Sequence, residues 1–378
     1  MTEWREQKLS DFMDFNPYTP LSKGIIAKKV TMEKLIPFNR KIQGYEDAVF
    51  SGGAKFKNGD TLVARITPCL ENGKTAYVDF LDDEEVAFGS TEFIVLRAKE
   101  GISDSRFIFY FAISDEFRDT AIQLMSGTSG RQRVDTEALK RKVFTLPPLP
   151  EQKAIAEVLS SLDDKIDLLT RQNKTLEDLA QAYFRKWFIE DASDEWEVGK
   201  LGDYIEIHDS KRVPLSKIER EKMKSGTLYP YYGAATIMDY VNDYIFDGEY
   251  ILMGEDGTVE TEDGYPVLQY ATGKFWVNNH AHVLTAKSPF NNYFIWFFLK
   301  QCNISGIVTG AVQPKINQEN LKNIDIPIPD LTLINSANQF FANIFAKILN
   351  NLEQIKTFQK LRDTLLPKLI SGEIRLKM

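Results

Sequence analysis

The chain is an imperfect internal duplication, and this repeat restricts its fold more than any other feature of the sequence. Trp4 recurs as Trp196, at a separation of 192 residues, Gly59 recurs as Gly248, and the aromatic run FIFYF at 107–111 recurs as FIWFF at 294–298. Repeats of solenoid proteins span about 20 to 50 residues. A unit of about 190 residues is therefore one duplicated globular module, which fits the two or three domains expected for 378 residues.

Each copy ends at a proline-rich hinge, LPPLP at 146–150 and IPIP at 326–329, and a long helical pattern follows each hinge. We expect Asp330 to cap the N-terminus of the second helix. Apolar residues then recur at alternating steps of three and four, which is the spacing of a coiled-coil seam. Asn173 and Asn351 each interrupt one seam. The predicted interface residues are Ile155, Leu159, Leu162, Ile166, Leu169, Asn173, Leu176, Tyr183, Ile344, Ile348, Asn351, Ile355 and Phe358. We expect the two helices to pair antiparallel; the alternative is that each helix packs only on its own globular domain.

The predicted fold class is α+β, with two tandem mixed α/β domains separated by two long helices and related as a pseudo-two-fold repeat. The predicted boundaries are residues 1–147 for the first domain, 148–189 for the central helix, 190–328 for the second domain and 329–378 for the distal helix. Short strand-like runs bounded by glycine turns and one helix late in each copy indicate mixed structure within both domains.

The net charge of −8 at first disfavours nucleic acid as a partner. The acidity is local, since residues 190–329 hold 12 Lys and Arg against 21 Asp and Glu. A local basic face is still possible, although the acidic total predicts weak DNA affinity for the chain alone. Two cysteines exclude a disulfide framework. The longest apolar run, at 293–299, is far shorter than a membrane span, so we expect a cytoplasmic protein with no membrane partner.

Motifs that carry catalysis are missing from the sequence. It has no GxxxxGK[ST] phosphate loop, no GxGxxG after a strand and no HExxH. The segment FNPY at 15–18 resembles the NPPY loop of amino-methyltransferases with one proline missing, and we interpret it as a turn. His280 and His282 share one face of a strand, but no third ligand is apparent beside them. We therefore expect no catalytic residues, no metal and no cofactor on this chain.

Both copies contain loops rich in side chains that hydrogen-bond to bases and phosphates. Arginine recognises guanine and Asn or Gln recognises adenine in the major groove, whereas Lys, Ser and Thr often contact phosphate. Both copies also place glycine, glutamine and a cation just before the hinge, in GTSGRQR at 127–133 and GAVQPK at 310–315. The predicted DNA-binding residues are Lys55, Arg65, Thr67, Ser90, Thr91, Arg131, Gln132, Arg133, Lys211, Arg212, Lys274, Asn278, Asn279, Gln313 and Lys315.

Four segments resemble a known family. The hinge and helix at 146–188, which begins LPPLPEQ and ends YFRKWF, and the segment LRDTLLPKLISGEI at 361–374 are similar to the central and distal regions of specificity subunits of Type I restriction-modification enzymes. The segments GSTEFIVLR at 89–97 and NNHAHVLTA at 278–286 resemble parts of their target-recognition domains. The resemblance covers nearly the whole chain.

The resemblance implies a non-catalytic subunit in which each domain reads one half of a split, asymmetric DNA target. The paired helices would set the gap and dock two modification subunits, which carry S-adenosylmethionine and methylate adenine. Restriction subunits that use ATP and Mg²⁺ would complete the complex. The second hinge lacks the PEQ of the first. This difference puts in doubt the expectation that modification subunits dock equally at both hinges. A coiled-coil scaffold with two protein-binding domains, and an enzyme with disguised motifs, remain as alternatives.

Overall fold

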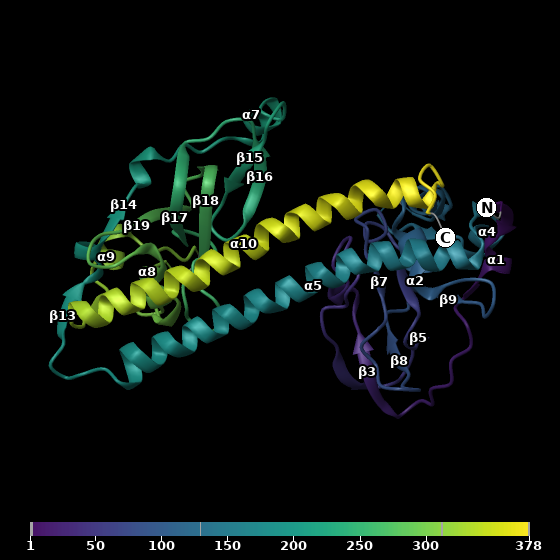
Figure 1. Cartoon of the computed structure of the whole chain (residues 1–378), viewed down its shortest axis with the longest axis horizontal. Coiled ribbons are helices and arrows are strands. Elements are labelled where there is room, and N and C mark those ends of the chain that lie inside the picture. Colours follow the sequence, from purple (N-terminus) through teal and green to yellow (C-terminus); the bar gives the residue numbers. More distant parts are fainter. Residues whose placement is uncertain (1–2, 129, 311–312, 377–378) are drawn as a thin grey trace. The chain divides into compact units, whose positions relative to one another are not determined.

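A computed structural model describes residues 3–128, 130–310 and 313–376. The chain forms two compact units, the first made of residues 1–169 with 353–378 and the second of residues 170–352. Each unit contains one mixed α/β domain together with part of both long helices (Figure 1).

The first unit contains two four-stranded sheets, in the orders β2-β9-β6-β7 and β4-β3-β8-β5. The first sheet is antiparallel throughout, and the second contains one parallel pair, β3 with β8. Two short pairs, β1-β12 and β10-β11, complete the unit. The strands are β1 Arg5–Lys8, β2 Met13–Phe15, β3 Ile26–Val30, β4 Glu46–Val49, β5 Ala54–Phe56, β6 Thr61–Ala64, β7 Thr75–Tyr77, β8 Ala87–Gly89, β9 Phe93–Ala98, β10 Met125–Ser126, β11 Arg133–Val134 and β12 Val143–Leu146.

Helix α2 forms the centre of the first unit's core. The helices are α1 Leu9–Phe12, α2 Ser105–Ile113, α3 Asp115–Gln123 and α4 Thr136–Lys140, with a 3-10 turn, η1, at Met32–Lys34. Every residue of α2 from Phe107 to Ile113 is buried, which accounts for the apolar run in the sequence. The single helix expected over 104–124 is divided at Ser114, because its hydroxyl accepts the Phe117 N–H and caps α3.

The second unit has one six-stranded sheet in the order β14-β19-β17-β18-β15-β16, plus the pair β13-β20. The strands are β13 Glu197–Lys200, β14 Ile205–Ile207, β15 Tyr229–Tyr232, β16 Ile237–Val241, β17 Phe246–Gly254, β18 Leu268–Val277, β19 Ala281–Ala286 and β20 Asp325–Ile328. The helices are α6 Leu201–Tyr204, α7 Lys217–Lys222, α8 Asn292–Gln301 and α9 Gln318–Lys322, with a 3-10 turn, η3, at Asp209–Lys211. The helix expected over 290–301 is α8, which Asn291 caps through the Phe294 N–H.

The two long helices are α5, Leu149–Arg185, and α10, Leu331–Ile370. A π-helical turn, η2, continues α5 over Lys186–Glu190. The predicted cap of the distal helix is confirmed, because Asp330 Oδ1 accepts the Leu333 N–H at 2.9 Å. Pro367 lies inside the last turns of α10, and the helix ends three residues later at Ile370.

The long helices pair antiparallel within each unit, as predicted. In the second unit, Asn351 Nδ2 donates to Asn173 Oδ1 at 2.8 Å, and the Tyr183 ring lies 4.9 Å from that of Phe340. In the first unit, Arg362 Nη1 donates to Asp163 Oδ1 at 2.7 Å. In the second unit, Asn173 of α5 thus contacts Asn351 of α10, and Tyr183, further along α5, contacts Phe340, which is earlier in α10. This order shows that the two helices run antiparallel.

The long helices pair with each other and also pack on the globular domains, so the alternative in which each helix packs only on its own domain is wrong. Ile155 and Leu159 belong to the core of the first unit, where they join Leu369 and Ile370 of α10. Phe184 of α5 and Phe341 of α10 lie together in the core of the second unit. The helix ends carry apolar residues outside the seam positions, and this wider face packs on the sheets and helices of the domain. Within the described residues, no helix has the length and apolar character needed to cross a membrane.

Candidate nucleic-acid interface

The two units share one backbone arrangement at the end of their central strands. Arg65 follows β6, and its N–H donates to the Glu92 carbonyl at 2.9 Å. Glu255 follows β17, and its N–H donates to the His280 carbonyl at 2.8 Å. Arg65 and Glu255 are therefore structurally equivalent, and so are Glu92 and His280.

A third position is fixed by the loop that precedes the hinge in each copy. Arg133 forms an antiparallel bridge with Ile66, and Lys315 forms the same bridge with Asp256. Arg133 and Lys315 are thus equivalent in structure, as the sequence repeat predicts. We call Arg65, Glu92 and Arg133 the first edge cluster, and Glu255, His280 and Lys315 the second edge cluster.

The first edge cluster is two arginines on one carboxylate. Arg133 donates from Nε and Nη2 to the Glu92 carboxylate at 2.7 to 3.0 Å, and Arg65 Nε lies 3.6 Å from Glu92 Oε2. The hydrogen bond from Arg133 lowers the pKa of Glu92 below its usual range, so this carboxylate is ionised at neutral pH. Two cations and one anion give the cluster a net positive charge.

A surface pocket of about 420 Å³ adjoins the first edge cluster. Its lining includes Tyr18, Lys55, Arg65 and Thr91. Tyr18 is 86% exposed, and Lys55 Nζ lies 5.4 Å from the centre of its ring. An exposed ring, two cations and a hydroxyl are groups that stack on bases and hydrogen-bond to phosphates.

Glycine shapes the loop in each copy. Gly127 has φ of 132° and Gly310 has φ of 88°, and a Cβ on Gly310 would lie 2.3 Å from the Gln313 carbonyl oxygen. A side chain at either position would be strained, so glycine is required by the local backbone. Of the loop residues in the sequence motifs, Ser129, Ala311 and Val312 lie outside the described residues.

The second edge cluster has a different charge pattern on the same backbone. Lys315 Nζ lies 3.4 Å from Glu255 Oε1, and His280 pairs with Asp256. Glu255 thus places an anion where the first unit has Arg65, and His280 replaces the anion Glu92. The two units offer different hydrogen-bonding groups at equivalent places.

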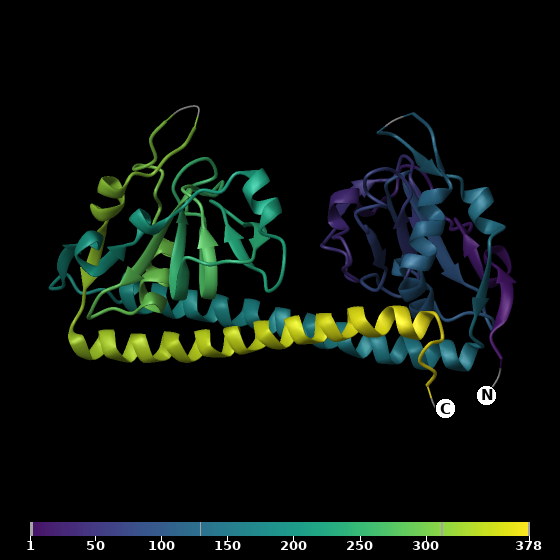
Figure 2. The same cartoon turned by 90° about the horizontal axis from the view of Figure 1, so that it is seen from above.

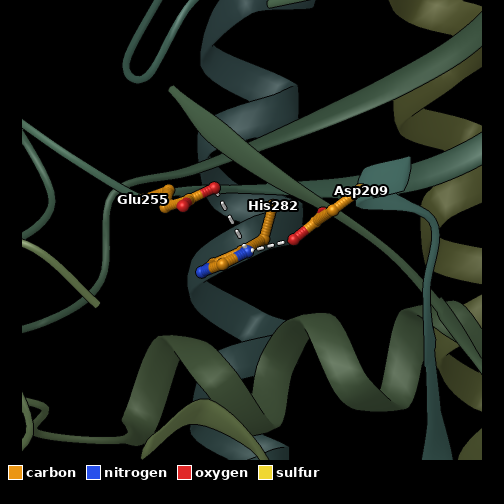
Figure 3. Close-up of side chains that lie close together, drawn as sticks. All are labelled: Asp209, Glu255 and His282. Atoms are coloured by element: carbon orange, nitrogen blue, oxygen red, sulfur yellow. Dashed lines mark hydrogen bonds and ion pairs between the residues drawn. The ribbon is translucent and has the colours of Figure 1, made fainter. Parts of the chain in front are cut away.

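Behind the second edge cluster lies an ionic network around His282 (Figure 3). His282 Nδ1 is 2.6 Å from Asp209 Oδ2 and 3.6 Å from Glu255, and Nε2 is 2.9 Å from the Ile316 carbonyl oxygen. Carbonyl and carboxylate oxygens accept hydrogen bonds, so both ring nitrogens of His282 face acceptors. Arg212 completes the network by donating to Glu255 Oε2 at 2.5 Å.

Asp209, Glu255 and His282 place possible ligand atoms within 4.8 Å of one another, a grouping that the sequence analysis missed. The three residues are far apart in the sequence, so no motif spacing marks them. A metal would need a lone pair on His282, yet both ring nitrogens face acceptors, and Arg212 already neutralises the carboxylates. The donor set therefore fits an ion network better than a metal centre.

The electrostatics of Asp209 agree with this description. Burial would raise the pKa of Asp209, but hydrogen bonds from His282 and the Val283 N–H, together with the Arg212 cation, hold it below its usual range. Asp209 is therefore ionised in the folded protein at neutral pH.

Most of the predicted DNA-binding side chains reach the surface. The exposed ones are Thr91, Arg131, Lys211, Lys274, Asn279, Gln313 and Lys315, and the half-buried ones are Lys55, Arg65, Thr67, Ser90, Gln132, Arg133 and Arg212. Lys55, Arg65 and Thr91 share one pocket, and Arg65 and Arg133 share Glu92. In the second unit, Lys274 Nζ lies 4.4 Å from the centre of the Tyr244 ring, and neither residue belongs to the second edge cluster.

Four side chains predicted to contact DNA form hydrogen bonds within the protein instead. Arg212, whose side chain is 11% exposed, donates to the Ala281 carbonyl and to Glu255, and Asn278 is 3% exposed and accepts the His280 N–H. For these two, the prediction of a DNA contact is corrected to a structural role. The Thr67 hydroxyl accepts the Gln132 N–H, and Ser90 Oγ accepts the Glu92 N–H, so both hydroxyls hold loop backbone.

The sequence matches a family described as the Type I restriction modification DNA specificity domain. Two copies match, over residues 1–178 and 193–364, and together they span most of the chain. The chain belongs to this family. The two matched segments coincide with the duplication found in the sequence, and each contains one edge cluster.

Relatives in this specificity family include proteins from bacteria and archaea. A putative type I restriction enzyme specificity subunit of Haemophilus influenzae is 37% identical over 150 residues, which cover 40% of this chain and 37% of the relative. The MjaIX specificity subunit of Methanocaldococcus jannaschii is 28% identical over 322 residues, which cover 74% of this chain and 71% of the relative. The matched part thus spans well under half of the first relative's length and about two thirds to three quarters of the second's.

A solved structure has the same fold. The Type I restriction-modification S subunit from M. genitalium matches 99% of this chain and 96% of its own, with a TM-score of 0.59 at 18% identity. The tandem α/β domains and two long helices are therefore an architecture that this specificity-family chain shares with it.

Proposed function

We propose that this chain is the DNA-reading subunit of a Type I restriction-modification complex, and that each unit reads one half of a bipartite, asymmetric target. One observation carries the proposal. The two copies of the specificity domain have the same backbone hydrogen bonds at their edge clusters but different charged side chains there. A duplicated reader with divergent side chains is suited to two different half-sites.

The long helices act as a spacer in this proposal. A helix rises about 1.5 Å per residue, so a pair of helices of 37 and 40 residues provides a rigid rod that fixes a gap. Two weak half-site contacts joined by a rigid spacer give tighter overall binding, through effective concentration. The acidic net charge of −8 supports dependence on partners, because this charge weakens the attraction of the lone chain to DNA.

We further propose that two modification subunits dock on the helices and that restriction subunits join them. Membership in the specificity family supports this docking, and α5 and α10 carry the exposed leucines Leu168, Leu179, Leu352 and Leu361 that a partner could contact. S-adenosylmethionine, ATP and Mg²⁺ belong to those partners in the proposal, and this chain contributes specificity without a catalytic centre. In this proposal the modification subunit flips the target adenine out of the duplex before methylation.

The test is to express the chain with its modification subunits in a host without DNA methylation and to map the methylated bases by sequencing. We expect one bipartite asymmetric motif, and we expect no methyl transfer by the purified chain alone with S-adenosylmethionine. Methyl transfer by the lone chain would instead support an enzyme. A complex that assembles but neither methylates nor binds DNA would support the scaffold alternative.

A further inference from the structure

The first edge cluster has the geometry of an arginine held in place for base reading. Glu92 hydrogen-bonds to Nε and Nη2 of Arg133, which are on one edge of the guanidinium. The other edge presents the N–H groups of Nη1 and the second N–H of Nη2, and among the described residues Nη1 donates no hydrogen bond to the protein. A guanidinium with one edge fixed by a carboxylate loses little further side-chain entropy when its second edge binds a ligand.

The position of Arg133 makes this second edge accessible. Its side chain is 42% exposed, and the hairpin β10-β11 that contains it lies at the end of the first unit away from α5 (Figure 2). Arg131 is exposed on the same hairpin, and Arg65 lies within 3.6 Å of Glu92 and lines the pocket. The surroundings are therefore positive and open, as contact with DNA requires.

Within the proposed function, and resting on it, we propose that Arg133 reads a guanine in the half-site of the first unit and that Glu92 is its positioning residue. Two parallel N–H groups of an arginine match the O6 and N7 acceptors of guanine in the major groove. Arg65 is a second cation beside the same carboxylate, at 3.6 Å from Glu92 Oε2.

The second unit supports this assignment by contrast. At the equivalent place Lys315 is a point charge beside Glu255, and His280 replaces the positioning carboxylate. An ammonium lacks the planar fork of a guanidinium, so Lys315 cannot present two parallel N–H groups to a base even though the Glu255 carboxylate lies beside it. The two half-sites are therefore read by different chemistry at one structurally equivalent position, and Lys315 provides a matched control.

The experiment uses the chain in complex with its modification subunits and a library of duplexes in which each half-site base is randomised. Methylation of each duplex is counted by sequencing for the wild type, Arg133→Ala, Arg133→Lys, Glu92→Gln and Lys315→Ala. We expect the wild type to prefer guanine at one position of one half-site. Arg133→Ala should reduce that preference by roughly 5- to 150-fold and leave the other half-site unchanged.

The other variants separate positioning from folding. Arg133→Lys should recover overall methylation more than guanine preference, and Glu92→Gln should weaken the guanine preference by less than Arg133→Ala does. Lys315→Ala should leave the guanine preference unchanged. Melting temperatures near that of the wild type would show that the variants fold.

Two results would overturn the inference while leaving the proposed function intact. One is a bipartite motif whose base preferences are all unchanged by Arg133→Ala. The other is an equal loss of methylation on every duplex, which indicates a phosphate contact or a structural role. A wild-type complex with no bipartite motif would instead contradict the proposed function itself.

Discussion

Single residues in this protein show how far a side chain's chemistry depends on its neighbours. Arg133 and Arg212 are both arginines in loops, and the sequence analysis gave them the same DNA-binding role. Arg133 keeps one edge of its guanidinium at the surface, whereas Arg212 is 11% exposed and binds Glu255 and backbone carbonyls. The difference arises because residues 255 and 281, distant in sequence, come together at the end of the sheet.

The buried Asp209 leads to a prediction for pH. Its pKa in the folded protein lies below the ordinary value of 3.8, so its ionised form adds stability that is fully present above about pH 4. This stability is lost as the pH falls from 3.8 through the lower folded pKa. Asp209→Asn should destabilise the second unit by roughly 1 to 3 kcal/mol at neutral pH and make its acid unfolding less steep.

Thermal unfolding measured from pH 7 to pH 2.5 tests the Asp209 prediction. Asp203→Asn, at an exposed position in the same unit, is the control and should give a curve parallel to that of the wild type. Parallel curves for Asp209→Asn and the wild type would mean that the network around His282 does not depend on the Asp209 charge.

At the scale of elements, the long helices combine two kinds of packing. Their seams pair antiparallel in both units, and their ends extend into the globular cores. The two asparagines of the seams meet, with Asn173 9% exposed and Asn351 fully buried. A polar residue within a coiled-coil seam fixes register at a cost in stability.

The asparagine pair is tested by a double-mutant cycle. Asn173→Leu alone should destabilise the chain by about 1 to 3 kcal/mol, because it leaves the buried amide of Asn351 without its acceptor. Asn173→Leu with Asn351→Leu should recover most of that loss, since both polar groups are then removed. Urea unfolding followed by circular dichroism measures both effects. Additive losses in the double variant would show that the two amides act independently.

At the scale of the whole molecule, the proposed function makes the helices a spacer of defined length. Deletion of residues 166–172 from α5 together with 353–359 from α10 removes seven residues, about two turns, from each rod. Such a deletion shortens a helix by about 10 Å, or roughly three base pairs of DNA. We expect the methylated motif to keep both half-sites and to lose about three base pairs from its gap.

The same genomic methylation map reads out this deletion, with a Gln172→Ala variant, at an exposed position of α5, as a full-length control. Half-sites that stay the same while the gap shortens would support the spacer. An unchanged gap would contradict it, since the distance between the half-sites would then be set by something other than the helices.

The sequence by itself determined the features that depend on local pattern. The duplication, the two long helices with their asparagines, the Asp330 cap and the equivalence of Arg133 with Lys315 all follow from periodicity and repeated spacing. The sequence was less accurate in aligning the central strands of the two copies. The sequence pairs Gly59 with Gly248, which sets Arg65 against Gly254, whereas the hydrogen bonds set Arg65 against Glu255.

Only the tertiary structure decided which polar residues are used inside the protein and which face solvent. The burial of Arg212 and Asn278, the network around His282 and the sharing of Glu92 by two arginines all join residues from separate strands and loops. Helix and seam signals are visible in sequence because they arise between residues three or four apart. Contacts at a sheet end depend on long-range strand pairing, and this pairing leaves no fixed spacing in the chain.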